Sequence, residues 1–146
     1  MRISRKAEYA LRALVAMSRQ QRSWSIAEIA RSESIPAKNL EQVLLALRRS
    51  GLLQSTRGAH GGYTMTRDPS SITVAEVITL LDGPIAPVPC AAEHPVERCS
   101  CPDPRTCALR KVMTEAREQL DKILGKRTIE DLRKLSPGNA PLAFEI

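Results

Sequence analysis

The sequence has few of the residues on which catalytic sites commonly depend. It contains only two histidines, His60 and His94, and these fall in unrelated segments that we expect to be loops. It contains no Ser/His/Asp constellation, no phosphate-binding loop and no paired-carboxylate motif, so neither nucleophilic catalysis nor hydrolytic metal chemistry has an evident set of residues. We therefore predict that the protein is not an enzyme.

Long hydrophobic runs are also lacking. No apolar stretch approaches the roughly 20 residues that a membrane-spanning helix requires. Residues 1–6 have neither the apolar segment nor the small-residue cleavage site of a signal peptide. The hydrophobic content of 42% nevertheless suffices for a core. We expect a globular cytoplasmic protein without membrane attachment, in which cysteines bind metal or do redox work rather than form structural disulfides.

Acidic residues are scarce in the first half of the chain. Residues 1–67 carry 12 Lys/Arg against 4 Asp/Glu, a net charge of +8, whereas residues 68–146 carry 10 against 12, a net charge of −2. Lys and Arg contacts to phosphates supply most of the non-specific affinity of proteins for nucleic acids. The asymmetry indicates either a nucleic-acid-binding module joined to a near-neutral segment or a basic surface that only meets solvent.

Three helical patterns occupy the first 50 residues. Apolar residues recur at helical spacing after Ser4, after the capping box formed by Ser25 and Glu28, and after Pro36, which suits the first turn of a helix. The side of the third helix opposite its apolar stripe carries Lys38, Gln42 and Arg49, with Asn39 and Glu41 at its flanks. These side chains can pair with base edges or phosphates, so we predict a recognition helix; the alternative is an ordinary three-helix bundle with a solvated polar face.

A hairpin is predicted directly after the third helix, which ends at Gly51. Residues 52–56 and 63–66 are β-prone and flank a glycine-rich tip that contains Arg57, His60 and Gly61. A tip without bulk can enter a minor groove, where arginine suits the negative potential, and His60 is expected to contact phosphate or solvent. We predict a mainly α-helical fold with a small β-hairpin wing, and a winged helix-turn-helix domain over residues 1–82.

The next segment, residues 83–106, has no helical or alternating pattern. A capping box at Thr73 and Glu76 opens a short helix that Gly83 ends, and six prolines then fall between residues 84 and 106. The chain's four cysteines lie in this loop or at its end: Cys90, Cys99, Cys101 and Cys107. Their spacing differs from the paired knuckles of most structural zinc sites. A loop of this length usually has a function, so we predict a cysteine-bearing sensor loop.

A long helix is predicted after the loop. Its apolar stripe consists of Leu109, Val112, Met113, Ala116, Leu120, Ile123 and Leu124. Residues 107–124 would span about 27 Å, which suits packing against a second copy of the chain. We therefore assign residues 107–135 to a dimerisation helix ended by Gly125 and a short helix capped by Thr128, and residues 136–146 to a flexible tail. Packing of the long helix within its own chain is the alternative.

Five short motifs occur in a fixed order between residues 9 and 63. They are Tyr9-Ala10-Leu11, Ser25-Ile26-Ala27-Glu28-Ile29-Ala30, Leu40-Glu41-Gln42-Val43-Leu44, Leu47-Arg48-Arg49-Ser50-Gly51-Leu52 and Arg57-Gly58-Ala59-His60-Gly61-Gly62-Tyr63. Together they resemble the Rrf2 family of bacterial winged-helix regulators, and the resemblance covers about residues 1–135. It implies a homodimeric repressor that binds a double-stranded DNA operator, with Glu41 and Gln42 reading bases and Arg57 entering the minor groove.

The resemblance also implies an iron–sulfur cluster of the 2Fe–2S or 4Fe–4S type. Iron–sulfur members typically carry three ligand cysteines in this loop, and Cys90, Cys101 and Cys107 match those positions. Cys99 is an additional residue with three alternative roles: to replace Cys101 as a ligand, to assist repair of the cluster, or to join an oxidised pair. The implied signal is redox state, nitric oxide or iron–sulfur status.

A fourth ligand in this family often comes from outside the loop. In the nitric-oxide-sensing branch it is a carboxylate in the first helix of the other subunit, and Glu8 matches that placement. The alternative for Glu8 is an ion pair with Arg12, four residues further along the helix. Two other hypotheses replace the cluster with zinc or with a metal-free thiol/disulfide switch. A further one makes the chain a metal-carrying module that contacts proteins.

Overall fold

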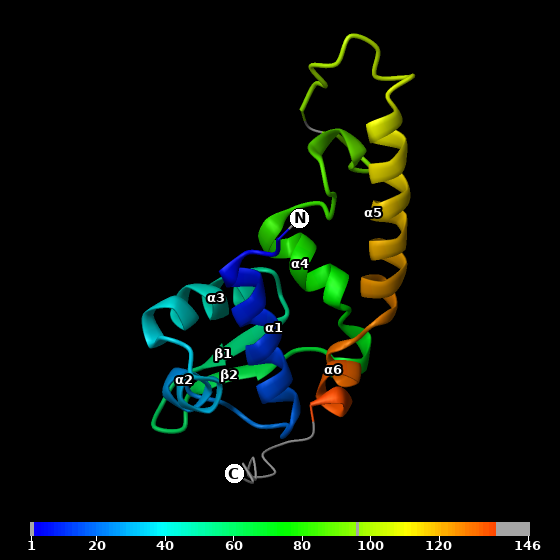
Figure 1. Ribbon diagram of the computed structural model, residues 1–146. Helices are drawn as coiled ribbons and strands as arrows, with labels where there is room; N and C mark the ends of the chain where they lie inside the picture. The colour runs from blue at the N-terminus through cyan, green and yellow to red at the C-terminus, as the bar shows by residue number, and fades with distance from the viewer. Residues whose placement is uncertain (1, 96, 137–146) are drawn as a thin grey trace, which may run out of the picture.

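The computed structural model describes residues 2–95 and 97–136, so the predicted flexible tail lies outside the described residues except for Ser136. It is mainly helical with one two-stranded hairpin, as predicted (Figure 1). The elements are α1 (Arg5–Ser18), α2 (Ile26–Glu33), α3 (Ala37–Arg49), β1 (Leu53–Thr56), β2 (Gly62–Met65), the 3-10 turn η1 (Pro69–Ser71), α4 (Val74–Asp82), the 3-10 turn η2 (Pro89–Ala91), α5 (Ala108–Lys126) and α6 (Ile129–Leu135).

Helix α1 lies at the centre of the molecule. Its alanines Ala7, Ala10 and Ala13 are completely buried, and their small side chains let neighbouring helices approach closely. The helix contacts α2, α3, α4, α6 and strand β2. It begins at Ser4, whose hydroxyl accepts a hydrogen bond from the Ala7 N–H at 3.0 Å. Helix α1 therefore packs against both other helices of the basic half and against one strand of the hairpin.

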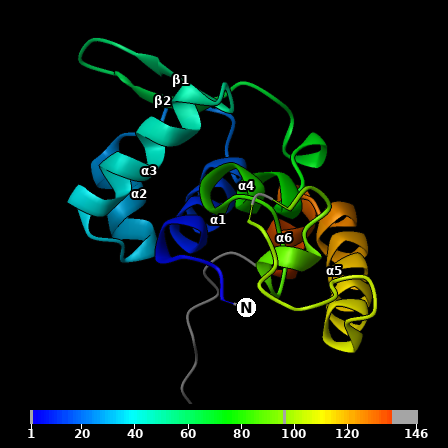
Figure 2. The same ribbon diagram turned by 90° about the horizontal axis from the view of Figure 1, so that it is seen from above.

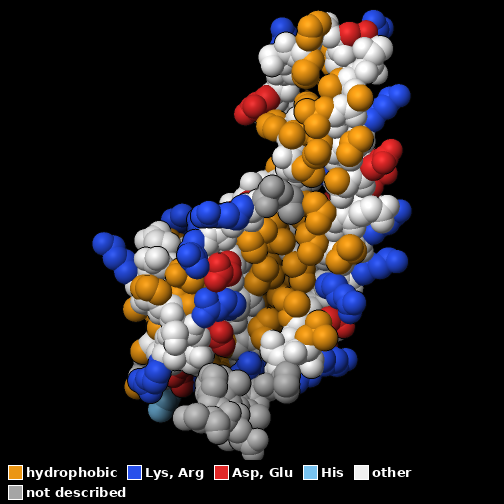
Figure 3. All heavy atoms as spheres, in the orientation of Figure 1, with side chains coloured by type: hydrophobic (Ala, Val, Ile, Leu, Met, Phe, Trp, Pro, Cys, Tyr) orange, Lys and Arg blue, Asp and Glu red, His pale blue; other side chains and the backbone are white. Residues whose placement is uncertain are grey.

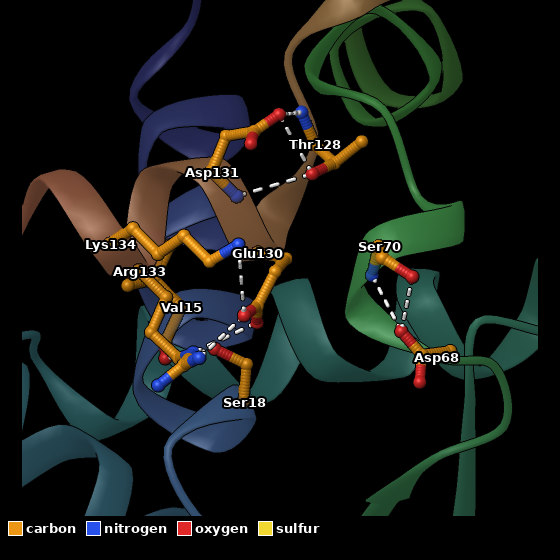
Figure 4. Close-up of polar contacts among 9 residues, drawn as sticks. All are labelled: Val15, Ser18, Asp68, Ser70, Thr128, Glu130, Asp131, Arg133 and Lys134. Atoms are coloured by element: carbon orange, nitrogen blue, oxygen red, sulfur yellow. Dashed lines mark hydrogen bonds and ion pairs between the residues drawn. The ribbon is translucent and has the colours of Figure 1, made fainter.

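Capping boxes fix two of the other helix starts. At α2 the Ser25 N–H donates to the Glu28 carboxylate at 2.8 Å, and the Glu28 N–H donates to Ser25 Oγ at 3.2 Å, as predicted. At α6 Thr128 and Asp131 exchange the equivalent bonds (Figure 4). The Thr128 N–H and hydroxyl lower the pKa of Asp131, which keeps this carboxylate ionised.

One predicted capping box and two predicted helix boundaries need correction. Thr73 Oγ1 accepts from the Glu76 N–H at 3.1 Å, but the Glu76 carboxylate pairs instead with Arg67 at 2.6 Å, so only half of the predicted box forms. Pro36 caps α3 rather than occupying its first turn. Gly125 does not end α5, which continues to Lys126, because a glycine costs a helix only about 1 kcal/mol.

The hairpin has a third hydrogen-bonded neighbour that the sequence did not indicate. Strands β1 and β2 pair antiparallel, with Leu53 opposite Met65 and Thr56 opposite Gly62. Trp24, between α1 and α2, joins β2 by a bridge: its N–H donates to the Tyr63 carbonyl at 2.9 Å, and the Tyr63 N–H donates back at 2.8 Å. The base of the hairpin is therefore fastened to the helical body.

Helix α5 is joined to the body on one side only. The Val74 N–H donates to the Arg127 carbonyl at 2.8 Å, and the Ile129 N–H donates to the Ile72 carbonyl at 2.9 Å. Leu120 and Leu124 pack against the small cluster Val74, Ile78 and Ile85. The second half of α5 thus packs partly within its own chain, which the sequence analysis gave as the alternative to dimerisation. Leu109, Val112 and Ile123 remain more than half exposed.

Helix α5 reaches beyond the body of the molecule. Its start, with the cysteine loop, lies at the opposite end of the structure from the hairpin (Figure 1). A band of hydrophobic side chains runs from the body along α4 and α5 (Figure 3). All residues of α5 are described, and none is buried in the single chain. Among the described helices, none combines the length and apolar character needed to cross a bilayer.

We predict that Gly62→Ala destabilises the protein by about 1–3 kcal/mol, because an added Cβ would overlap the Trp24 backbone carbonyl. Gly125→Ala is the matched control. Its Cβ would meet nothing within 4 Å, and the helix interior favours alanine over glycine by about 1 kcal/mol, so this change should stabilise. Urea unfolding of both variants measures the two effects. Equal stability of Gly62→Ala and the wild type would contradict the bridged hairpin.

Candidate nucleic-acid interface and cysteine loop

Helix α3 separates its two sides as the sequence predicts. Leu40, Val43, Leu44 and Leu47 are buried in the main core. The predicted DNA-facing side chains are all exposed: Lys38, Asn39, Glu41, Gln42 and Arg49. In the described residues none of these five forms an ion pair. They are therefore available to a duplex, and their contacts with bases or phosphates remain predictions.

The turn between α2 and α3 is fastened to α1. Ser34 adopts the left-handed conformation with φ 52°, and Ile35 inserts into the core. Arg12 of α1 donates to the Glu33 carbonyl and lies 3.6 Å from the Glu33 carboxylate. A turn held by both an apolar anchor and a charge-assisted bond gives α3 a fixed direction.

The hairpin presents its tip away from the helices, as Figure 2 shows. Arg57 and His60 are exposed there, and Gly61 is half-buried. Gly58 has φ +116°, and a Cβ on Gly61 would lie 2.6 Å from the Thr56 carbonyl oxygen. The tip therefore needs glycine for its own geometry. Its narrowness is the property that a minor groove would require.

The sequence did not predict two features of this interface. The bridge from Trp24 fixes the hairpin, and a β-prone residue isolated between two helices gave no signal of it. Helix α1 also brings Arg5 and Lys6 beside Lys38 of α3. The basic run at the start of the chain was visible, but only the fold shows which helix it adjoins.

The four cysteines of the loop lie between η2 and the start of α5. Cys90 lies in η2, which packs on α5, and Cys107 caps α5 by accepting the Arg110 N–H at 3.5 Å. Between them, the Cys101 N–H donates to the Cys99 sulfur at 3.4 Å. Cys101 is exposed, and the other three are half-buried.

These contacts shift the pKa values of Cys99 and Cys101 in opposite directions. The Cys101 N–H lowers the pKa of Cys99, with smaller contributions from the thiols of Cys101 and Cys90 and the charge of Arg110. The hydrogen bond and negative charge of Cys99 raise the pKa of Cys101 to about 11, and Cys107 acts in the same direction. The pair Cys99 and Cys101 therefore favours a single negative charge, carried by Cys99.

The predicted ligand set is only partly assembled in the single chain. Thiolates are suitable donors for an iron–sulfur cluster or zinc, so the residue types fit. Within residues 2–95 and 97–136, however, no three His, Cys, Asp or Glu side chains surround a point that could hold a metal ion. The thiols are pairwise neighbours along the loop rather than a closed set.

Glu8 occupies the ion pair that the sequence offered as its alternative role. Its carboxylate lies 3.3 Å from Arg12 and 3.4 Å from Arg5. The carboxylate is more than one-third exposed, so neither pair contributes much stability. Ligation by Glu8 would need only these weak surface pairs to break, and it remains a prediction.

The helix, turn, helix and fastened hairpin define a winged helix-turn-helix protein, a class of transcription regulators. A family model described as "Iron-dependent Transcriptional regulator" matches residues 3–134. The chain belongs to this family, the Rrf2 family of transcriptional regulators.

Three relatives illustrate the breadth of the match. An rrf2-like HTH-type transcriptional regulator of Rhodobacter capsulatus is 35% identical over 143 residues, 94% of each chain. The HTH-type transcriptional regulator IscR of Xenorhabdus nematophila is 32% identical over 136 residues, 92% of this chain and 80% of its own. The structure of CymR, the global cysteine regulator of Bacillus subtilis, matches with a TM-score of 0.77 at 30% identity, covering 93% of this chain and 98% of that chain.

We predict that Cys99 of the reduced, metal-free protein is alkylated before Cys101. A lowered pKa gives Cys99 more thiolate at about pH 8, whereas the initial labelling rate of Cys101, while Cys99 is still unmodified, should rise as the pH approaches about 11. Timed iodoacetamide labelling followed by mass spectrometry measures both rates. Equal labelling of the two residues across this pH range would contradict the shared charge.

Proposed function

We propose that the protein is a homodimeric repressor that reads a DNA operator with α3 and the hairpin, and that an iron–sulfur cluster in the cysteine loop sets its affinity. One observation carries this proposal. An exposed, donor-rich α3 and a narrow basic hairpin share one end of the molecule, and four thiols gather at the other end, at the start of an incompletely covered helix.

The exposed stripe of α5 supports the dimer. Leu109, Val112 and Ile123 are 56–58% exposed, and no residue of this helix, described throughout, is buried in the single chain. A long helix with a sustained apolar side is stabilised by packing against a partner helix. A symmetric pair would present two copies of α3, which is how helix-turn-helix dimers contact half-sites about one DNA turn apart.

The chemistry of the exposed side chains supports the reading of bases. Gln42 and Asn39 can pair with adenine, and Glu41 can accept from cytosine. Lys38 and Arg49 suit guanine or phosphate, whereas Arg57 with the flanking tip suits a minor groove. Specificity would then come from α3, and much of the affinity from the hairpin and the basic residues.

The iron–sulfur cluster is proposed on three grounds. Thiolates are the usual ligands of such clusters, the family description names iron, and IscR is among the relatives. We assign Cys90, Cys101 and Cys107 as ligands, with Cys99 as the substitute for Cys101 and Glu8 of the second subunit as the fourth ligand. When bound, the cluster would supply a covalent constraint across the loop that oxidants or nitric oxide can remove.

The loop has a short route to the DNA-facing helices. It begins directly after α4, whose last residue, Asp82, accepts a hydrogen bond from the Ser4 N–H at 2.8 Å. Ser4 caps α1, and α1 holds the turn before α3 through Arg12. A constraint on the loop would therefore act on α4, on α1 and finally on the direction of α3.

A metal-free thiol switch is the second candidate, and the contact between Cys101 and Cys99 favours it. In this scheme two thiols lose two protons and two electrons to hydrogen peroxide, which is reduced to two waters while an S–S bond forms. CymR, among the structural relatives, is described in an oxidized form.

We predict that Gln42→Ala relaxes sequence preference by about 1–3 kcal/mol per lost base contact. Arg57→Ala should weaken binding through loss of the minor-groove contact. Lys134→Ala, a change of one charge on α6, is the control and should bind as the wild type does. Fluorescence anisotropy with a duplex selected from a random-sequence pool measures all three. Wild-type binding by both test variants would refute the assigned interface.

We predict that protein purified without oxygen is coloured and contains iron and acid-labile sulfide. Cys107→Ala should lose the colour, because it removes a proposed ligand, whereas Ser100→Ala in the same loop should keep it. Visible absorption and iron, zinc and sulfide analysis decide between the candidates. A colourless protein after anaerobic reconstitution, with a disulfide formed by peroxide, would instead establish the thiol switch.

A further inference from the structure

We propose that the hollow between the starts of α1 and α3 binds a phosphate of the DNA backbone. The hollow has a volume of about 360 Å³ and is lined by Arg5, Lys6 and Tyr9 of α1 and by Lys38, Asn39, Gln42 and Val43 of α3. This inference rests on the proposed DNA-binding function. It adds a phosphate site, built largely by α1, to the base contacts of α3.

The charge of the hollow suits an anion. Three of its lining side chains, Arg5, Lys6 and Lys38, are cationic, and no Asp or Glu is among the described residues that line it. The Arg5 guanidinium lies 3.4 Å from the Glu8 carboxylate, which also pairs with Arg12. The Arg5 side chain is 69% exposed, so its ion pair with Glu8 holds it only weakly. Neither Lys6 nor Lys38 forms an ion pair with any described residue.

Three of the four neutral side chains that line the hollow can donate a hydrogen bond to an anion, and the fourth, Val43, is apolar. Asn39 and Gln42 carry amide N–H groups, and Tyr9 carries a hydroxyl. Lys38 and Asn39 also lie in the first turn of α3, where Pro36 forms no side-chain cap with the described residues. The Asn39 N–H donates to the Pro36 carbonyl at 3.0 Å, so the helix start adds only a modest favourable potential for a phosphate, and the cations supply the main attraction.

The neighbours of the hollow favour a phosphate of DNA over a free one. Gln42 and Lys38 line it and also belong to the proposed base-facing side of α3. A duplex seated on α3 would carry its sugar-phosphate backbone along the edge of the groove that α3 enters, beside α1. In Figure 3, Lys and Arg side chains gather on the side of the molecule where α1 begins and α3 lies.

The site is held in place from behind. The Ser4 hydroxyl and N–H both donate to the Asp82 carboxylate, the latter at 2.8 Å, immediately before Arg5 and Lys6. The first turn of α1 is therefore tied to the last residue of α4. Because the backbone that carries these two cations is fixed, the segment loses less conformational entropy on binding a phosphate than a mobile arm would.

The test measures the affinity of the full-length protein for a random-sequence duplex and for a selected duplex at several salt concentrations. Lys6→Gln should weaken binding to both duplexes by the same factor and reduce the slope of log Kd against log salt by about 1. The preference for the selected duplex should not change. Lys134→Gln on α6, with the same change of charge, should leave the slope unaltered.

Three results would overturn the inference, and they are distinguishable. Wild-type binding with an unchanged slope in both Lys6→Gln and the Arg5→Gln/Lys6→Gln double variant would refute the phosphate site alone. Lys6-dependent thermal stabilisation by inorganic phosphate, with an unchanged DNA slope, would assign the hollow to a free anion. Failure of the wild type to bind any duplex would refute the proposed function together with this site.

Discussion

Close packing around α1 is the constraint on which the rest of the structure depends. Completely buried alanines at Ala7, Ala10 and Ala13 let α2, α3, α4 and α6 approach one helix, and Leu14 fills the centre of the core. Larger side chains at these positions would separate the helices, because a well-packed interior has little room to adjust. Because the apolar side of α3 is buried in the core against α1, only its polar side is available to a ligand.

The same helix joins the two ends of the molecule to which we assign functions. At its start, Ser4 is bound by Asp82, the residue before the cysteine loop. One turn later its cations line the hollow beside α3, and Arg12 then fastens the turn that leads into α3. Helix α1 therefore contacts both ends, and in the proposed mechanism a change in the loop reaches the DNA-facing side through this helix without any large domain motion.

The sequence predicted the parts that short-range patterns determine. The order of helices, the capping box of Ser25 and the hairpin followed from local periodicity and turn chemistry. Contacts between distant segments could not be read in this way: the bridge from Trp24 to Tyr63 and the capture of Glu76 by Arg67 both depend on tertiary neighbours. The proposed metal site was the least predictable feature, because the cysteine spacing identifies candidate donors but does not show whether they surround one point.

In the proposed mechanism, the state of the cysteine loop controls the affinity of α3 and the hairpin for DNA. The most direct test measures the DNA affinity of one anaerobic preparation before and after its iron is removed, with iron content and thiol state determined in each sample. We expect the affinity for the selected duplex to change with iron content. Equal affinity of the iron-loaded, iron-free and disulfide forms would contradict it.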